Sequence, residues 1–227
     1  MSPLKRPIIL INLVLLYQKE RDIMKKIVKD EMDIVFLLDR SGSMGGIEDD
    51  TIGGYNSYIK EQRKNNVLVT TVLFDDRYEL LTDRLPINKV DELNRDKYYV
   101  RGSTALLDAI GKSINYIDSK KSKKALFIIT TDGYENSSRE FSKEKIKEMI
   151  KKHDNYEFIY IGADIDSYSE AASIGISRSN TASYKKDKKG ISTLFKSVSK
   201  ASSMMCEDAC LGSSWKEDLD SYIKENS

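Results

Sequence analysis

Five oxygen-bearing side chains stand where predicted strands end or predicted helices begin, and their types suit a hard divalent cation. They are Asp39, Ser41, Ser43, Thr104 and Asp132. Two carboxylates and three hydroxyls, without imidazole or thiolate, are the kind of ligands that Mg²⁺ or Mn²⁺ prefers. Neighbouring glycines allow the sharp turns that aim short side chains at one point. The pattern predicts a Mg²⁺ (or Mn²⁺) site with at least one exchangeable position.

The composition excludes several other kinds of site. The 227 residues are 40% hydrophobic and 32% charged, which is typical of a globular chain of one or two domains. One histidine, His153, and two cysteines, Cys206 and Cys210, argue against a tetrahedral zinc site and a disulfide-rich secreted fold. We expect the two thiols to be unbridged. The net charge of +1 gives no indication of sequence-specific nucleic-acid binding.

Strand and helix patterns alternate from residue 33 onward. Continuous apolar runs predict buried strands, and a shorter polar run predicts an antiparallel edge strand. The expected strands cover residues 34–38, 67–74, 78–85 (the edge), 125–131 and 158–161, and the expected helices lie near 48–65, 90–93, 107–117, 146–150, 168–172 and 191–201. This order predicts an α/β fold with a doubly wound, mostly parallel sheet and helices on both faces. Ligands bind such sheets beyond the carboxyl ends of the strands, where Asp39 and Asp132 stand.

The order D-x-S-x-S, then Thr, then Asp resembles the metal-ion-dependent adhesion site of von Willebrand factor type A (vWA) domains. All five positions match, and the resemblance covers residues 31–203. It implies a Rossmann-like fold in which Ser41, Ser43 and Thr104 touch the metal and the aspartates act directly or through water. An Asp or Glu carboxylate of a protein partner would complete the metal shell.

The resemblance also bears on location and motion. The stretch 180–184 (Asn-Thr-Ala-Ser-Tyr) is similar to compact stand-alone bacterial members, which implies a cytoplasmic module. In some relatives ligand capture shifts the last helix, and residues 190–203 are the analogous segment here.

The expected organisation is an N-terminal extension (1–23), a vWA domain (31–203) and a C-terminal tail (204–227). The apolar run 8–17 is shorter than the roughly 20 residues that span a bilayer, so we expect no membrane span. Either the true start is Met24, or the extension is a short anchor, a signal or a packed segment. If the extension is genuine, an exported or anchored protein is the alternative to a cytoplasmic one.

Three functions stay open at this point. The first is a non-enzymatic module whose divalent metal captures a partner carboxylate. The second is a metal-dependent phosphoryl-transfer enzyme that uses Asp39, although Ser41 stands where such enzymes have a second carboxylate. The third is a structural vWA module without metal. A serine hydrolase is disfavoured, because His153 precedes a strand and so lies at the opposite end of the sheet from Ser41 and Ser43.

The remaining acidic residues have structural interpretations. We expect Asp75 and Asp76 to form a turn, and the alternative is that they lie near the metal and tune its charge. We expect Asp108 to favour its helix dipole, and Asp164 and Asp166 to form an Asx turn and helix cap.

Charge is distributed unevenly along the chain. Most lysines and arginines precede the strands and acidic residues follow them, which predicts a basic face opposite an acidic rim around the metal. The exceptions on the acidic side are Arg40, Arg77, Arg101 and Arg139. The basic face predicts either a second, anionic partner or a solvated lysine fringe. The basic residues are Lys25, Lys26, Lys29, Arg63, Lys64, Lys120, Lys121, Lys123, Lys124, Lys151 and Lys152.

Overall fold

A six-stranded sheet forms the centre of the protein. The computed structural model describes residues 31–163, 165–207 and 211–226. The strands are β1 (Met32–Asp39), β2 (Val67–Phe74), β3 (Tyr78–Pro86), β4 (Ala125–Thr131), β5 (Tyr156–Gly162) and β6 (Thr181–Ser183). Their spatial order is β3-β2-β1-β4-β5-β6, and every pair is parallel except β2 with β3. The predicted fold class, including the antiparallel edge strand, is confirmed.

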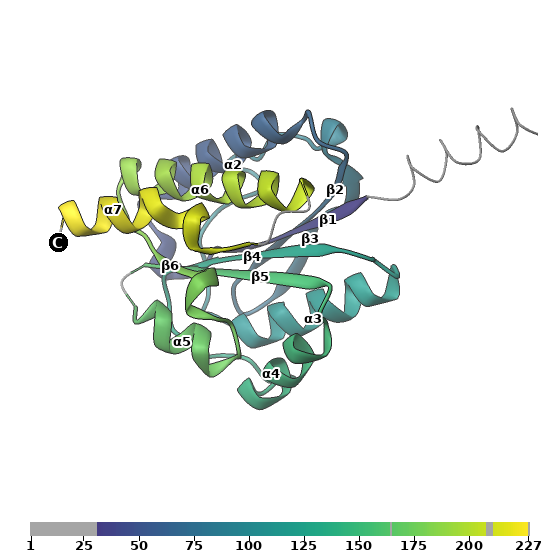
Figure 1. Ribbon diagram of the computed structural model, residues 1–227. Coiled ribbons are helices and arrows are strands. Elements are labelled where there is room, and N and C mark those ends of the chain that lie inside the picture. Colours follow the sequence, from purple (N-terminus) through teal and green to yellow (C-terminus); the bar gives the residue numbers. More distant parts are fainter. Residues whose placement is uncertain (1–30, 164, 208–210, 227) are drawn as a thin grey trace, which may run out of the picture. The chain divides into compact units, whose positions relative to one another are not determined.

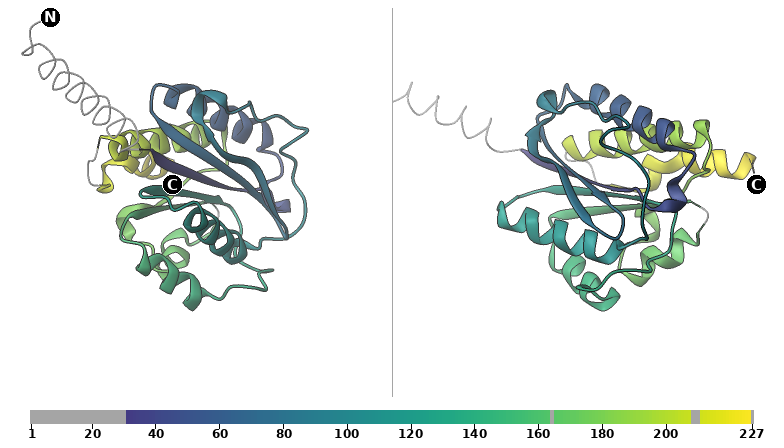
Figure 2. Two further views of the ribbon diagram at one scale, coloured as in Figure 1. Left: turned by 90° about the vertical axis from the view of Figure 1, so that its right-hand side faces the viewer. Right: turned by 180° about the vertical axis from the view of Figure 1, so that it is seen from behind.

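Helices cover both faces of this sheet (Figures 1 and 2). They are α2 (Glu48–Gln62), α3 (Leu106–Ser119), α4 (Lys143–Lys152), α5 (Ser167–Ser173), α6 (Lys188–Cys206) and α7 (Glu217–Glu225). Single 3-10 turns occupy Gly42–Met44, Ile87–Lys89, Arg178–Asn180 and Ser213–Lys216. None of the helices in the described ranges is long and apolar enough to cross a membrane.

Strand β1 is buried on both sides, which explains its unbroken apolar sequence. Ile34 and Phe36 pack in one core with residues of α2, α6 and α7. Val35 and Leu37 pack in a second core with residues of α3, α4 and α5. The carboxyl end of β1 therefore emerges between two helical layers, where the predicted site residues follow it.

The helix expected near residues 90–93 is not formed. A 3-10 turn, Ile87–Lys89, ends before it, and Val90 and Leu93 are buried within an irregular loop. The side chain of Asn56 accepts a hydrogen bond from the Leu93 amide (2.8 Å) and donates one to its carbonyl (2.9 Å). Because α2 supplies these partners, the loop satisfies its backbone without a helix.

The described residues of the segment expected as a tail pack onto the domain. Trp215 and Leu219 belong to the core shared with α6, and their exposed fractions are 1% and 0%. The Trp215 indole donates a hydrogen bond to the Ser179 carbonyl at 3.0 Å. These residues are thus part of the compact unit that begins at Met32. Residues 1–23, Cys210 and Asp164 lie outside the described residues, so the expectations for them stay predictions.

A buried ion-pair cluster connects the first two strands with the loop before α3. Asp75 Oδ2 accepts hydrogen bonds from Arg40 Nε (2.9 Å) and Arg101 Nε (2.6 Å), and Arg40 Nη2 donates to Glu79 (2.6 Å). The Arg40 and Asp75 side chains are fully buried. Burial alone would raise the pKa of Asp75, but the Arg101 hydrogen bond and the two guanidinium charges outweigh it and hold the pKa below its usual value.

The edge strand β3 is irregular. Its register against β2 shifts on both sides of Thr71, and Arg84 adopts a positive φ of 45°. The Arg84 guanidinium donates to both carboxylate oxygens of Asp33, at 2.7 and 3.1 Å, which ties the bend to β1.

Replacing Trp215 by alanine should destabilise the domain by about 3–5 kcal/mol, because the change empties a packed position. Urea unfolding of the full chain measures this loss. Leu85→Ala, on the edge strand with 39% of the residue exposed, is the control and should lose about 1 kcal/mol or less. Similar losses for both variants would contradict the buried position of residue 215.

Replacing Asp75 by asparagine should destabilise the protein by about 3–5 kcal/mol, since it removes the buried charge partner of Arg40 and leaves only the partly exposed Glu79. The wild-type contribution of Asp75 should be lost as the pH falls from about 3.8 downward, because the folded-state pKa lies below the unfolded one. Chemical unfolding at neutral and acidic pH measures both effects. Asp49→Asn, in an exposed pair with Arg95, is the matched control and should leave stability nearly unchanged. An equal loss in the two variants would refute the buried-pair explanation.

Candidate metal site

Asp39 ends β1 and is fully buried. Its Oδ1 accepts a hydrogen bond from the Ser41 amide (2.7 Å) and its Oδ2 accepts one from the Thr131 hydroxyl (2.6 Å). Burial raises the pKa of Asp39 to about 6, although these hydrogen bonds oppose the rise. Because burial disfavours the charged carboxylate, a cation at this position would stabilise the ionised form.

The two serines follow β1: Ser41 precedes the 3-10 turn Gly42–Met44 and Ser43 lies within it. Ser41 is buried and Ser43 is exposed, with their hydroxyl oxygens 3.1 Å apart. The Ser43 hydroxyl donates to Asp132 Oδ1 at 2.5 Å, across the gap between the ends of β1 and β4. The Gly42 amide donates to the Gly102 carbonyl at 3.1 Å, which joins this turn to the Thr104 segment.

Thr104 is held by the loop that follows β4. Its amide donates to the Asn136 side chain (2.9 Å), and its carbonyl accepts from the Asn136 and Ser137 amides (3.0 and 3.2 Å). These bonds hold Thr104 against the loop after β4, although the two are far apart in the sequence.

The three hydroxyls converge at Gly133. A β-carbon at this glycine would lie 3.0 Å from the Thr104 oxygen, 3.3 Å from that of Ser43 and 3.9 Å from that of Ser41. The structure thus brings all five predicted residues to one end of the sheet. Ser41, Ser43, Thr104 and Asp132 surround this point, and Asp39 lies behind Ser41.

This arrangement fits a hard divalent cation. All the side-chain donors are hydroxyl or carboxylate oxygens, and the exposed Ser43 leaves one side accessible. The described residues contain no group of three or more His, Cys, Asp or Glu side chains that could hold a metal ion. Hydroxyls supply most of the donors in the candidate site.

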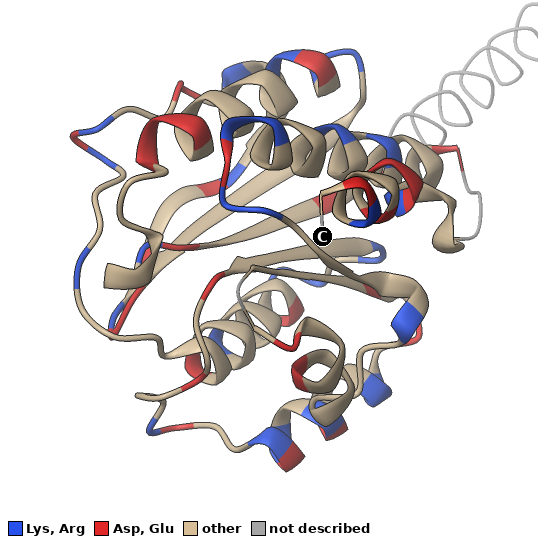
Figure 3. Ribbon diagram, turned by 90° about the vertical axis from the view of Figure 1, so that its left-hand side faces the viewer, with Lys and Arg blue, Asp and Glu red and all other residues tan. Residues whose placement is uncertain are grey.

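Lys186 is a residue of this site that the sequence analysis missed. It lies in the connection between β6 and α6, and its Nζ is 2.8 Å from Asp132 Oδ2. The same Nζ donates to the Ser43 carbonyl at 2.8 Å. The expected acidic rim therefore also carries basic residues, which are Lys185, Lys186, Lys188 and Lys189. Figure 3 shows lysine positions along this connection, near acidic residues of neighbouring loops. Residues that follow a strand are the ones expected near the site, and these lysines follow β6. They were not among the candidates because the three-residue β6 was not predicted.

Asp75 and Asp166 have the structural roles expected of them, and Asp108 has a further one. Asp75 accepts from the Arg77 amide at 2.8 Å in the predicted turn, and Asp166 caps α5 by accepting from the Ser169 amide at 3.0 Å. Asp108 does more than favour its helix dipole. Its carboxylate accepts from the amides of residues 139–141 at 2.9–3.0 Å and so fixes the loop that leads to α4.

His153 lies away from the serines, as predicted. It follows α4 and contacts Asp118 through Nε2 (3.0 Å) and the Met149 carbonyl through Nδ1 (2.7 Å). Its ring stacks on Tyr156, the first residue of β5, at the amino end of the sheet. No base for Ser41 or Ser43 is supplied from this position.

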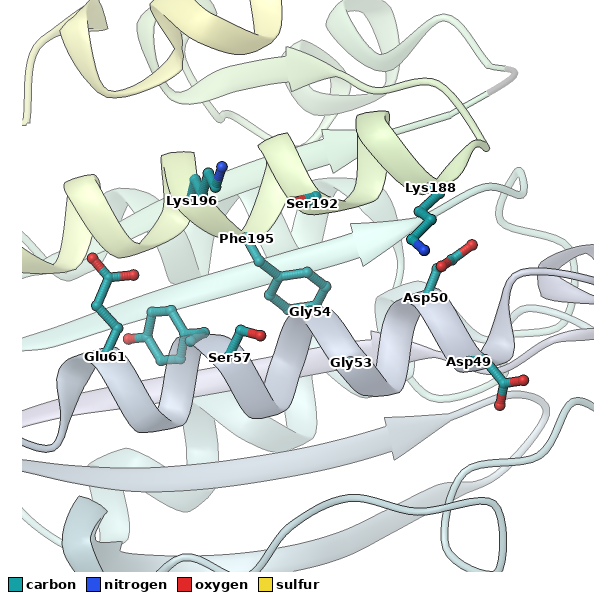
Figure 4. Close-up of a pocket in the computed structure, with 11 residues that line it drawn as sticks. Asp49, Asp50, Gly53, Gly54, Ser57, Glu61, Lys188, Ser192, Phe195 and Lys196 are labelled. Carbon is teal, nitrogen blue, oxygen red and sulfur yellow. The ribbon is translucent and has the colours of Figure 1, made fainter.

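A separate groove of about 480 Å³ lies between α2 and α6 (Figure 4). Its α2 wall carries Asp49, Asp50 and Glu61, and its α6 wall carries Lys188 and Lys196. The first turns of both helices, which follow the Asp39 and Lys186 loops, line one end of this groove.

Several solved structures share this fold. The PilB minor pilin from Streptococcus sanguinis is 13% identical with a TM-score of 0.61, and the match covers 79% of this chain and 62% of that chain. The vWF domain of the type V pili tip protein Mfa5 from Porphyromonas gingivalis is 10% identical with a TM-score of 0.59, covering 78% and 96%. Proximal thread matrix protein 1 from the mussel byssus, solved with a zinc-occupied MIDAS motif, is 20% identical with a TM-score of 0.56, covering 78% and 46%. This chain thus spans under half the length of the byssus protein and about three-fifths of the pilin.

These identities are low, so the structural matches show a shared fold. A search of curated proteins found no match. The family profile described as "VWA domain containing CoxE-like protein" matches residues 18–154, which is more than half of the chain. The matched segment includes all five residues of the candidate site. The chain therefore belongs to the family of VWA-domain-containing CoxE-like proteins.

Proposed function

We propose that this protein is a non-enzymatic binding module in which a divalent metal, Mg²⁺ or Mn²⁺, captures a carboxylate of a protein partner. The observation that carries the proposal is the convergence of three hydroxyls at Gly133, beside the Asp132 carboxylate. The resemblance to vWA domains implies that the metal is touched by Ser41, Ser43 and Thr104. It implies that Asp39 and Asp132 act on the metal directly or through water. When bound, the metal would supply a positive charge at the accessible carboxyl ends of β1 and β4.

The known structures support this proposal by analogy. One neighbour of the same fold carries zinc at its MIDAS motif, and two others are a pilus tip protein and a minor pilin. An Asp or Glu side chain of a partner is the ligand that suits the exchangeable position of a hard cation. Binding would then depend on the metal, because a carboxylate has no attraction to Asp132 itself.

Two observations favour binding over phosphoryl transfer from Asp39. Both of its carboxylate oxygens already accept hydrogen bonds, from the Ser41 amide and the Thr131 hydroxyl. Ser41 also stands where an aspartyl-phosphate enzyme has its second carboxylate. A vWA module without metal is the remaining alternative, and metal titration tests it.

The second, anionic partner expected on the basic face stays a prediction, as does cytoplasmic location. Two lysines of that face are engaged within the fold. Lys124 Nζ donates to the Met205 carbonyl at 2.5 Å, and Lys120 Nζ lies 4.8 Å from the Tyr116 ring centroid. These contacts favour the lysine-fringe interpretation.

Mg²⁺ or Mn²⁺ should stabilise the full-length protein against heat. At about 100 times the dissociation constant, the ion should add roughly 2.7 kcal/mol, which corresponds to a rise in melting temperature of about 5–10 °C. Melting in EDTA, Mg²⁺ and Mn²⁺ measures the shift, which Asp132→Ala should abolish. A flat response to Mn²⁺ at tens of millimolar would leave the structural module as the better description.

Gly133→Ala should remove this metal-induced shift, since its methyl group would enter the space between the Thr104 and Ser43 hydroxyls. Gly53→Ala is the matched control, because a β-carbon there meets nothing within 4 Å. It should keep the full metal response and gain about 0.5–1 kcal/mol from its position inside α2. Melting of both variants with and without Mn²⁺ decides the matter, and an undiminished shift in Gly133→Ala would place the metal elsewhere.

A protein partner should be retained by the immobilised wild-type chain in Mg²⁺ and released by EDTA. The immobilised Gly133→Ala variant should not retain it, because the capture requires the metal. Once the partner is identified by mass spectrometry, replacing single Asp or Glu residues by the amides should locate one whose loss abolishes binding. Retention that survives both EDTA and the Gly133→Ala change would contradict metal-mediated capture.

A further inference from the structure

The Lys186 ammonium is the cation that faces the Asp132 carboxylate in this structure. The two groups are 2.8 Å apart, and the Asp132 side chain is fully buried while that of Lys186 is 24% exposed. A buried carboxylate needs a compensating positive charge, which Lys186 supplies from outside the sheet. The lysine is fixed at a second point, the Ser43 carbonyl.

A divalent ion bound by Ser43 and Asp132 would lie close to this ammonium. Both would draw on the Asp132 carboxylate, and two cations at such short range repel each other strongly. Metal and ammonium are therefore competitors for one carboxylate.

We propose that Lys186 is a built-in competitor of the metal, which neutralises Asp132 in the metal-free protein and is displaced when a divalent cation binds. This inference rests on the proposed function, because it assigns a regulatory residue to the same site. It makes metal affinity depend on how firmly the segment 184–187 holds Lys186 in place.

The neighbours of Lys186 connect the site to distant elements. Tyr184 donates from its amide to the Gly162 carbonyl (3.0 Å), and its hydroxyl lies 3.8 Å from the Met44 sulfur in the serine turn. Asp187 Oδ1 caps α6 by accepting from the Gly190 amide at 2.7 Å. Both Asp187 oxygens also accept from the Tyr222 hydroxyl of α7 at 3.0 Å.

Displacement of Lys186 would therefore affect the segment 184–187, a junction where the connection to α6 contacts the Gly162 carbonyl, Met44 and Tyr222 of α7. The first turn of α6 starts at this junction and lines the groove shown in Figure 4. Metal binding at the carboxyl ends of β1 and β4 would thus be coupled to the start of α6, to α7 and to the groove wall that Lys188 forms.

The test is Mn²⁺ binding to the full chain, measured by isothermal titration calorimetry for the wild type, Lys186→Met and Lys185→Met. Lys185→Met is the matched control, because it removes the same charge one residue away. The Lys185 ammonium donates to the Asn226 carbonyl and does not contact the site. Lys186→Met should bind Mn²⁺ at least tenfold more tightly than the wild type, and Lys185→Met should stay within about threefold. Binding by Lys186→Met that equals or falls below that of the wild type would overturn the proposal while leaving the metal site intact.

Hydrogen exchange on the wild type provides a readout that needs no variant. Mn²⁺ should speed hydrogen exchange of the amides of residues 185–191, because Lys186 no longer tethers this segment. The amides of residues 41–44, which carry the two serines, should become protected. Protection of both segments would contradict displacement. If neither the folded wild type nor folded Lys186→Met binds Mn²⁺ at tens of millimolar, the proposed metal site itself is wrong, and this inference falls with it.

Discussion

The parallel pairing of β1 with β4 is the constraint on which the site depends. The register aligns Leu38 with Thr130, so the next residues along, Asp39 and Thr131, meet in a hydrogen bond. Asp132, one residue later, is then within reach of Ser43. A slip of one residue would turn each side chain of β1 to the opposite face and exchange its two cores. The apolar residues on both faces of β1 therefore hold the carboxylates in place.

The polar groups around the site are held by neighbours rather than by solvent. Asp39 is fixed by an amide and a hydroxyl, Thr104 by Asn136, and the backbone between Arg40 and Arg101 by a 2.8 Å hydrogen bond. Beneath them, Asp75 lies between two guanidinium groups. The Asp39 carboxylate and the backbone around Thr104 are therefore fixed in place before any ligand arrives.

Much of the fold and the candidate site was predictable, because both follow local sequence patterns. Continuous apolar runs located β1, β2, β4 and β5, and the residues that follow β1 and β4 located Asp39 and Asp132. Lys186 was missed because β6 has only three residues and no apolar run of its own. The packing of Trp215 was also missed, since its partners lie in α6 and at Ser179, far away in the sequence. The irregular loop at Val90 depends on Asn56, which no local pattern in residues 90–93 indicates.

The two edge strands of the sheet, β3 and β6, differ in length, but neither favours pairing with a strand of another chain. On one side β3 is bent by its register shifts and carries Arg84 at a positive φ, and on the other side β6 is only three residues long. Straight, regular edges invite an additional strand from another chain, and bent or short ones discourage it. Recognition by strand addition is thereby disfavoured at both sides of this sheet. Under the proposed function, the loops beyond its carboxyl ends are the surface that contacts the partner protein.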